Sequence, residues 1–149
     1  MYRSTKNENS YHEYKQSLKF SLRSNYKKTE KGCYFCEPEP HIVIFKTENF
    51  YISKNNFPYD FWDGQKVIEH FLLVSKKHFS DLESKDKELL LEYGELVNKY
   101  SNKGFDIYTR TPNSPSRSQV HFHTHLIKTD EKKIKSLNFV FNPYSLIVK

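Results

Sequence analysis

The sequence predicts an α+β domain built on a mostly antiparallel sheet. Its hydrophobic patterns occur in the order helix, strands, helix, strands, whereas a parallel sheet would require strands and helices to alternate along the chain. The 149 residues fit one domain of ordinary size. Hydrophobic residues make up 36% and aromatic residues 16% of the chain, so Phe and Tyr must supply much of the core.

The N-terminal segment, residues 1–31, is predicted to be a basic arm that carries its own helix. It contains eight Lys and Arg against three Asp and Glu, whereas the body, residues 32–149, is almost neutral. Ser10 and Glu13 form a capping-box pattern, and apolar residues then recur at helical spacing, which predicts a helix over residues 11–27. The arm either contacts phosphates or an acidic partner, or only reflects an AT-rich genome that favours Lys at solvated positions.

The body is predicted to begin with a β-hairpin. Residues 42–45 and 50–53 are short runs of β-favouring residues that are separated by a turn. Residues 55–64 follow as a loop. Residues 70–74 form a mostly apolar run that is typical of a buried strand.

One amphipathic helix is predicted in the middle of the body. Ser80 and Glu83 give a second capping-box pattern, and Gly104 is expected to end the helix. The apolar residues between them recur at helical spacing. They are Leu89, Tyr93, Leu96, Val97 and Tyr100.

After this helix the chain is predicted to return to the sheet. Residues 105–109 and 120–128 read as strands, joined by a loop rich in Pro, Ser and Asn. Residues 130–136 are expected to form a polar turn or a short helix. Residues 139–148 contain one or two terminal strands that are interrupted at Pro143.

The composition argues against membrane and secreted proteins. No apolar run approaches the roughly 20 residues of a membrane-spanning helix, and the N-terminus lacks the apolar region of a signal peptide. We therefore expect a cytoplasmic protein without a membrane partner. In that compartment a lasting disulfide is disfavoured.

The most informative motif is a row of three histidines at alternate positions, His121, His123 and His125. In a strand these side chains share one face. The neighbouring positions are Val120, Phe122, Thr124 and Leu126. Because this second set is mostly apolar, we expect it to pack inward and the histidine face to line a cleft. The alternative is a solvent-exposed polar face of an edge strand.

This row and three other segments resemble the histidine-triad (HIT) family. The string His121–Ile127 alternates His with mostly apolar residues, as the signature of this family does. The segment His70–His78 is similar to the family's strand that leads into a Lys-rich turn and a His. Cys33–Cys36 is similar to the Cys pair that opens many microbial members, and Asn55–Pro58 to the segment that faces the nucleoside. The resemblance implies a HIT-like antiparallel sheet with a central helix, here with an extra N-terminal helix.

The resemblance implies a chemical role for the residues around the triad. His123 would attack an α-phosphate and form a nucleotidyl-imidazole intermediate. An imidazole with a pKa of about 6.5 is largely neutral at pH 7, so one ring nitrogen keeps a free lone pair. His125 would stabilise the charge that develops during the reaction, and Ser118 would contact a phosphate.

The resemblance also implies residues that hold the substrate. Asn55 and Asn56 would bind the ribose hydroxyls, and His70 would line the same site. Arg117 lies next to the predicted phosphate contact, and its planar guanidinium suits a bidentate phosphate interaction. We expect Arg110 to be a surface partner for an acidic residue.

Cys33 and Cys36 form a C-x2-C pair, which is a common half of a tetrahedral zinc site. A disulfide or two buried thiols are the alternatives. In the zinc-bearing branch of the HIT family the other two ligands would correspond to His78 and His121. A closed set of two Cys and two His implies a structural zinc ion rather than a catalytic one.

The sequence departs from the family pattern in ways that bear on the substrate. Thr124 stands where an aliphatic residue is usual, Glu69 where Gly is common and Ser75 where Pro is common. The loop over residues 59–68 is longer than in compact members and is expected to act as a lid. None of these departures removes a predicted catalytic group.

Taken together, these features predict a nucleotide hydrolase or nucleotidyltransferase that acts at an α-phosphate. Its substrate would be a nucleoside phosphoramidate or a dinucleoside polyphosphate, and the family resemblance implies a homodimer. One alternative is a non-enzymatic nucleotide sensor or adaptor that keeps the same residues. Another is a zinc-containing nucleic-acid-binding protein that uses the basic arm, which we do not favour because the arm is separate from the motif-bearing body.

Overall fold

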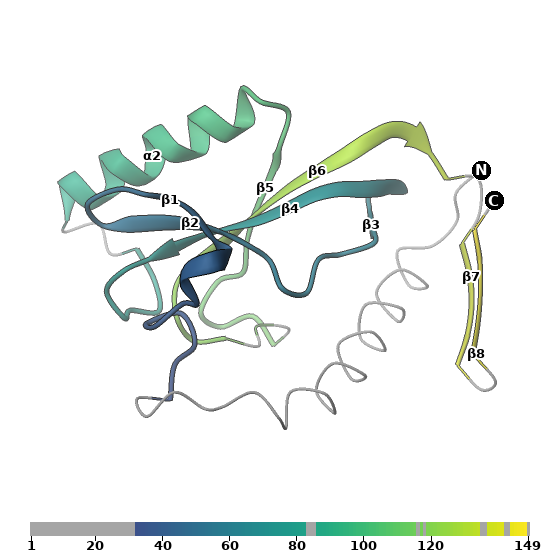
Figure 1. Cartoon of the computed structure of the whole chain (residues 1–149), viewed down its shortest axis with the longest axis horizontal. Helices are drawn as coiled ribbons and strands as arrows, with labels where there is room; N and C mark the ends of the chain where they lie inside the picture. Colours follow the sequence, from purple (N-terminus) through teal and green to yellow (C-terminus); the bar gives the residue numbers. More distant parts are fainter. Residues whose placement is uncertain are drawn as a thin grey trace. The chain divides into compact units, whose positions relative to one another are not determined.

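The structure of the chain is a computed structural model (Figure 1). It describes residues 32–82, 86–115, 117, 119–134, 137–141 and 144–148. Within these ranges the chain forms two compact units. One unit contains residues 32–56 and 69–128, and the other contains residues 57–68 and those from 129 onward. The predicted N-terminal helix over residues 11–27 and the predicted phosphate contact Ser118 lie outside the described residues.

The predicted α+β class with a mostly antiparallel sheet is confirmed. The strands of the main sheet are β1 (Val43–Lys46), β2 (Phe50–Lys54), β3 (Phe61–Trp62), β4 (Gln65–Ser75), β5 (Asp106–Thr109) and β6 (His123–Lys133). Their order is β1-β2-β4-β6-β5, with β3 paired to β4. The pairs β1–β2, β2–β4, β3–β4 and β5–β6 are all antiparallel. Strand β6, which carries the histidines, therefore lies between β4 and β5.

The helix α2 (Lys87–Ser101) begins later than predicted. Its N-cap is Asp86, whose carboxylate accepts a hydrogen bond from the backbone N–H of Leu89 at 3.0 Å. The capping box predicted at Ser80 is therefore wrong, because Asp86 already satisfies an exposed donor of the first turn. The predicted helix stop is confirmed, since Gly104 has a φ of 79°, which favours glycine after a helix.

The two faces of the sheet pack against different parts of the chain. Helix α2 covers one face (Figure 1). The core on this side includes Phe50, Ile52, Leu73, Leu89, Leu96, Tyr100, Phe122 and Leu126. On the other face, Phe35, Tyr51, Leu72 and Val74 form a second cluster together with Cys33. Because side chains alternate along a strand, the odd-numbered histidines of the β6 region and His70 of β4 belong to this second face.

The segment predicted as a loop over residues 55–64 ends in a β-hairpin. Strands β3 and β4 are joined by Asp63 and Gly64, which have φ values of 47° and 76°. Two consecutive positive φ values are what a two-residue hairpin turn requires, and Asp-Gly is a favoured sequence for it. Strand β4 therefore starts at Gln65 rather than at residue 70, and the expected lid over residues 59–68 is a hairpin instead of a loop.

Strand β6 continues to Lys133 and so includes residues 130–133, the first part of the stretch 130–136 that was predicted to be a polar turn or short helix. Thr129 donates to the side-chain oxygen of Gln65 at 3.1 Å, and the backbone N–H of Ile134 donates to the carbonyl of Gly64 at 2.8 Å. These tertiary contacts override the local preference of a polar sequence.

Strands β7 (Leu137–Phe141) and β8 (Tyr144–Val148) form a separate antiparallel hairpin, in agreement with two terminal strands interrupted near Pro143. Among the helices that the structure describes, none has both the length and the apolar character needed to cross a membrane.

Candidate active site and metal centre

The three histidines of the row are brought together at the start of β6. His123 and His125 are strand residues, whereas His121 precedes the strand, so the predicted strand start at residue 120 is wrong. The next positions, Phe122, Thr124 and Leu126, are buried, which confirms that they pack inward. Val120 does not join them and is 68% exposed, because it lies before the strand begins. The histidines are also buried, with at most 9% of each residue exposed.

His123 is held by its own strand. Its Nδ1 atom lies 2.8 Å from the backbone carbonyl oxygen of His121. A carbonyl oxygen can only accept, so Nδ1 must carry the hydrogen and donate it. In the neutral ring this tautomer leaves the lone pair on Nε2. The arrangement presents an imidazole nitrogen that is able to act as a nucleophile.

His125 belongs to a polar chain that reaches across the sheet. Its Nδ1 atom lies 2.9 Å from Nε2 of His70 on β4, and the two ring centroids are 5.1 Å apart. The side-chain nitrogen of Asn55 lies 3.1 Å from the same His70 nitrogen. Three residues that were predicted from separate segments, Asn55, His70 and His125, are therefore in contact.

Burial favours the neutral forms of His123 and His125. Desolvation lowers the pKa of His125 well below its usual value of 6.5, and the nearby rings of His70 and His123 act in the same direction. Desolvation also lowers the pKa of His123, and the charges of Arg117 and Arg110 add to this effect. A neutral His123 keeps the lone pair that nucleophilic attack requires.

Phe35 contacts two of the histidines on the same face of the sheet. Its ring centroid is 5.1 Å from that of His123 and 5.7 Å from that of His121. The buried hydroxyl of Tyr51 donates to the backbone carbonyl of Phe35 at 2.7 Å and so fixes the turn between the two cysteines. The sequence analysis assigned no role to either residue. The place of Phe35 between the two cysteines could have indicated that it lies close to the metal ligands.

The four predicted metal ligands are assembled in one place. One donor atom from each of Cys33, Cys36, His78 and His121 lies within 4.8 Å of the others. Nδ1 of His121 is 3.3 Å from Sγ of Cys33 and 3.6 Å from Sγ of Cys36, and Nδ1 of His78 is 3.3 Å from Sγ of Cys36. Neighbouring ligand atoms around a tetrahedral zinc ion are roughly 3.3–3.8 Å apart. The cysteines do not form a disulfide.

The surroundings of His121 fit a metal ligand. Its Nε2 atom lies 2.7 Å from the backbone carbonyl oxygen of Ser75 and 3.0 Å from the Ser75 hydroxyl. The carbonyl requires Nε2 to carry the hydrogen, so the lone pair of Nδ1 points toward the thiols. This group of two thiols and two imidazoles is compatible with zinc. Ser75 is a further contributor that sequence reasoning did not assign.

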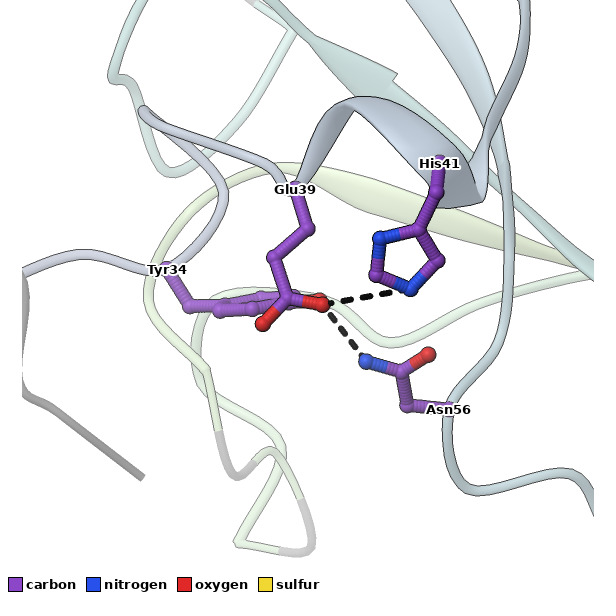
Figure 2. Close-up of polar contacts among 4 residues, drawn as sticks. All are labelled: Tyr34, Glu39, His41 and Asn56. Carbon is purple, nitrogen blue, oxygen red and sulfur yellow. Dashed lines mark hydrogen bonds and ion pairs between the residues drawn. The ribbon is translucent and has the colours of Figure 1, made fainter.

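Two other predicted substrate residues contact different groups in the structure. Asn56 donates to the hydroxyl of Tyr34 at 2.7 Å, beside an ion pair of 3.4 Å between Glu39 and His41 (Figure 2). Arg117 donates from Nε and one terminal nitrogen to three backbone carbonyls. These carbonyls belong to Gln119, Ser80 and Val120. The substrate roles of Asn56 and Arg117 stay predictions.

The fold can be compared with solved structures. A HIT family hydrolase from Legionella pneumophila aligns with a TM-score of 0.52 and 21% identity, over 68% of this chain and 94% of its own. A HIT family hydrolase from Clostridium thermocellum aligns with a TM-score of 0.54 and 19% identity, over 69% and 95%. The diadenosine triphosphate hydrolase of Plasmodium falciparum aligns with a TM-score of 0.53 and 20% identity, over 64% and 65%.

At the level of sequence, the comparisons point to a family without an assigned activity. Residues 1–140 match the family model that is described as "Protein of unknown function (DUF3605)". No curated protein matches the chain. Since the family model spans most of the chain, this protein belongs to the DUF3605 family, and its fold is that of the histidine-triad proteins.

Proposed function

We propose that this protein is a nucleotide hydrolase or nucleotidyltransferase that attacks an α-phosphate through His123. The observation that carries the proposal is the 2.8 Å hydrogen bond from Nδ1 of His123 to the carbonyl of His121, which leaves Nε2 as the nucleophilic atom. The names of the aligned structures support the same class of reaction, since two are called HIT family hydrolases and a third a diadenosine triphosphate hydrolase.

The reaction would proceed in two steps. Nε2 of His123 attacks the α-phosphorus and forms a P–N bond, while the bond from phosphorus to the leaving group breaks and its electron pair departs with that group. The leaving group then takes up a proton. In the second step water, or another acceptor hydroxyl in a transferase, attacks phosphorus, loses its proton and releases His123. His125 would hydrogen-bond the phosphate oxygens as charge develops on them.

The remaining predicted residues would hold the nucleotide. Asn55 lies beside His70 and would bind a ribose hydroxyl, with Asn56 as its neighbour. Ser118 and Arg117 would contact phosphate oxygens from the loop that precedes the histidine row.

We also propose that the group of Cys33, Cys36, His78 and His121 holds a structural zinc ion. Two thiolates and two neutral imidazoles fill a tetrahedral coordination sphere, which leaves no open position for a substrate. When bound, zinc would supply folding stability, with an apparent binding free energy on the order of 10 kcal/mol at neutral pH.

The test is turnover of a fluorogenic adenosine phosphoramidate by the wild-type chain and by His123→Ala. We expect the variant to lose at least about 1,000-fold in kcat/KM, because it lacks the atom that forms the P–N bond. Wild-type turnover by the variant would reject His123 as nucleophile. Tight nucleotide binding without turnover by the wild-type chain would favour a sensor or adaptor instead.

A further inference from the structure

Ser75, the last residue of β4, is fully buried, and its hydroxyl contacts the segments that carry both histidines of the proposed metal centre. Its Oγ atom lies 3.0 Å from Nε2 of His121, 2.9 Å from the carbonyl oxygen of Lys77 and 3.4 Å from that of Phe122. The carbonyl of Lys77 belongs to the peptide group that joins Lys77 to His78. The hydroxyl therefore touches one imidazole ligand and the peptide group next to the other.

The neighbouring carbonyls fix the direction of these hydrogen bonds. The backbone carbonyl of Ser75 lies 2.7 Å from Nε2 of His121, so Nε2 carries the hydrogen. Oγ of Ser75 must then accept from Nε2, which shares its hydrogen between the two oxygens of Ser75. The hydrogen of the hydroxyl is left for a carbonyl, and that of Lys77 is nearer than that of Phe122. A chain of hydrogen bonds thus runs from the ring of His121 through Ser75 to Lys77.

This chain of hydrogen bonds suits a metal centre in two ways. A bond from Nε2–H holds the His121 ring in the tautomer whose Nδ1 lone pair faces the thiols, and it makes that nitrogen a more basic ligand. The bond to Lys77 holds the turn that carries His78, whose ring meets that of His121 edge to face at a centroid distance of 4.8 Å. His78 is exposed, so packing restrains it less than it restrains the buried His121.

The pairing of the strands does not require this hydroxyl. The backbone N–H of Ser75 donates to the carbonyl of Phe122 at 3.4 Å, and this bond stays when the side chain is shortened. The contacts of the hydroxyl are also particular to this chain, since Ser75 stands where Pro is common in the HIT family and proline has no hydroxyl. These two facts separate a role toward the metal ligands from a role in the sheet.

We propose that the hydroxyl of Ser75 positions both imidazole ligands of the metal centre. It lets the quartet of Cys33, Cys36, His78 and His121 bind zinc more tightly than it would without this hydrogen-bond chain. The inference rests on the proposed zinc centre and does not depend on the reaction assigned to His123.

The test is the zinc affinity of the full chain, measured by competition with a chelator, for the wild type, Ser75→Ala, Ser75→Thr and the control Ser53→Ala. Ser53 is a matched control because it is a buried serine of the neighbouring strand β2, 2% exposed, and lies outside the quartet. We expect Ser75→Ala to weaken zinc binding by about 10-fold, Ser75→Thr to stay within about 3-fold of the wild type and Ser53→Ala within about 2-fold. Ser75→Ala should also change the d–d absorption of the cobalt-loaded chain, whereas Ser53→Ala should not.

Several results would overturn the inference. They are an unchanged affinity and cobalt spectrum in Ser75→Ala, an equal loss in Ser53→Ala, or a loss in Ser75→Thr as large as in Ser75→Ala although the hydroxyl is kept. Near-ultraviolet circular dichroism shows that each zinc-loaded variant is folded. A wild-type chain that takes up no zinc would reject the zinc centre together with this inference. Turnover of adenosine phosphoramidate by the same samples tests the role of His123 separately.

Discussion

His121 takes part in both centres through different atoms. Its backbone carbonyl accepts the hydrogen bond from His123, while its ring faces the cysteines and is oriented by Ser75. Fixing the ring of His121 therefore also restrains the carbonyl that selects the tautomer of His123. In this way a structural metal at the cysteines would help to position the proposed nucleophile without touching the substrate.

The burial of His125 predicts a pH dependence of stability. In the unfolded chain its pKa returns to about 6.5, while in the folded chain the pKa lies well below that value. Below pH 6.5 the unfolded state therefore binds more protons, and the free energy of unfolding should fall as the pH decreases toward the folded-state pKa. Above pH 6.5 His125 is neutral in both states, so the full stability is present and His125 no longer makes it depend on pH.

The variant His125→Gln isolates this contribution. Between pH 6.5 and 5 the wild-type chain should lose up to about 1.4 kcal/mol more stability per pH unit than the variant, as measured by urea unfolding. The metal ligands are present in both chains, so their acid sensitivity cancels in the difference. The same slope in both chains would show that His125 is not kept neutral by burial.

For individual residues, the sequence was most informative at positions where the proposed chemistry allows only a few residue types, such as His and Cys. The spacing of the histidines and the Cys pair led to the residues that meet in the structure. Ser75, Phe35 and Tyr51 were not found, because each acts through a backbone carbonyl or a ring contact that depends on tertiary packing. Tyr108 was not identified either, because only the pairing of β5 with β6 places its ring 5.8 Å from that of His125.

Among the elements, the turn between Cys33 and Cys36 is the segment on which the metal proposal depends. His78 offers the sharpest test, because it is the exposed member of the quartet and its replacement leaves the core intact. We expect the wild-type chain to carry one zinc ion per chain and His78→Gln to bind zinc at least about 100-fold more weakly. Elemental analysis and titration with a chelator measure both quantities.

His41 provides the matched control for this experiment. It is also an exposed histidine, but it pairs with Glu39 and lies outside the quartet. His41→Gln should therefore keep the zinc content and affinity of the wild-type chain. A wild-type chain that takes up no zinc, or a His78→Gln variant that retains it fully, would contradict the assignment.

Two glycines near helix α2 should respond oppositely to the same substitution. Gly94 is exposed inside the helix, and an added Cβ would meet no atom within 4 Å, so Gly94→Ala should stabilise the fold by about 1 kcal/mol. Gly104 also has open space around it, but its φ is +79°, so Gly104→Ala should destabilise by about 1 kcal/mol. Urea unfolding measures the change in the free energy of unfolding for both variants. Equal changes would contradict the helical backbone at Gly94 and the positive φ at Gly104.

The predictions of helices and strands were most accurate where the hydrophobic periodicity and the turn residues indicated the same element, as in the β1–β2 hairpin and the body of α2. Strand β3 was missed although Asp63-Gly64 is a strong hairpin signal, because residues 55–64 were assigned as one loop on their Pro, Asp and Asn content. The end of β6 was missed because its polar residues are held in the strand by contacts with Gln65 and Gly64.

For the whole molecule, the net charge of +6 says little about the proposed chemistry. Most of it belongs to residues 1–31, whereas the histidines and cysteines lie in an almost neutral body. The role of the basic arm and the expected homodimer stay predictions. The order of the sheet accounts for the contacts of His125, because it places β6 between β4, which supplies His70, and β5, which supplies Tyr108.

The central claim is that His123 carries the nucleotide during turnover. The most direct measurement is mass spectrometry of the wild-type chain after rapid mixing with diadenosine triphosphate and quenching at alkaline pH, where a phosphorus–nitrogen bond to histidine survives. We predict one added adenosine monophosphate, located on the peptide that contains His123, and none on His123→Ala. Nucleotide attached to another residue, or turnover by the wild-type chain with no covalent adduct at any time, would contradict the account.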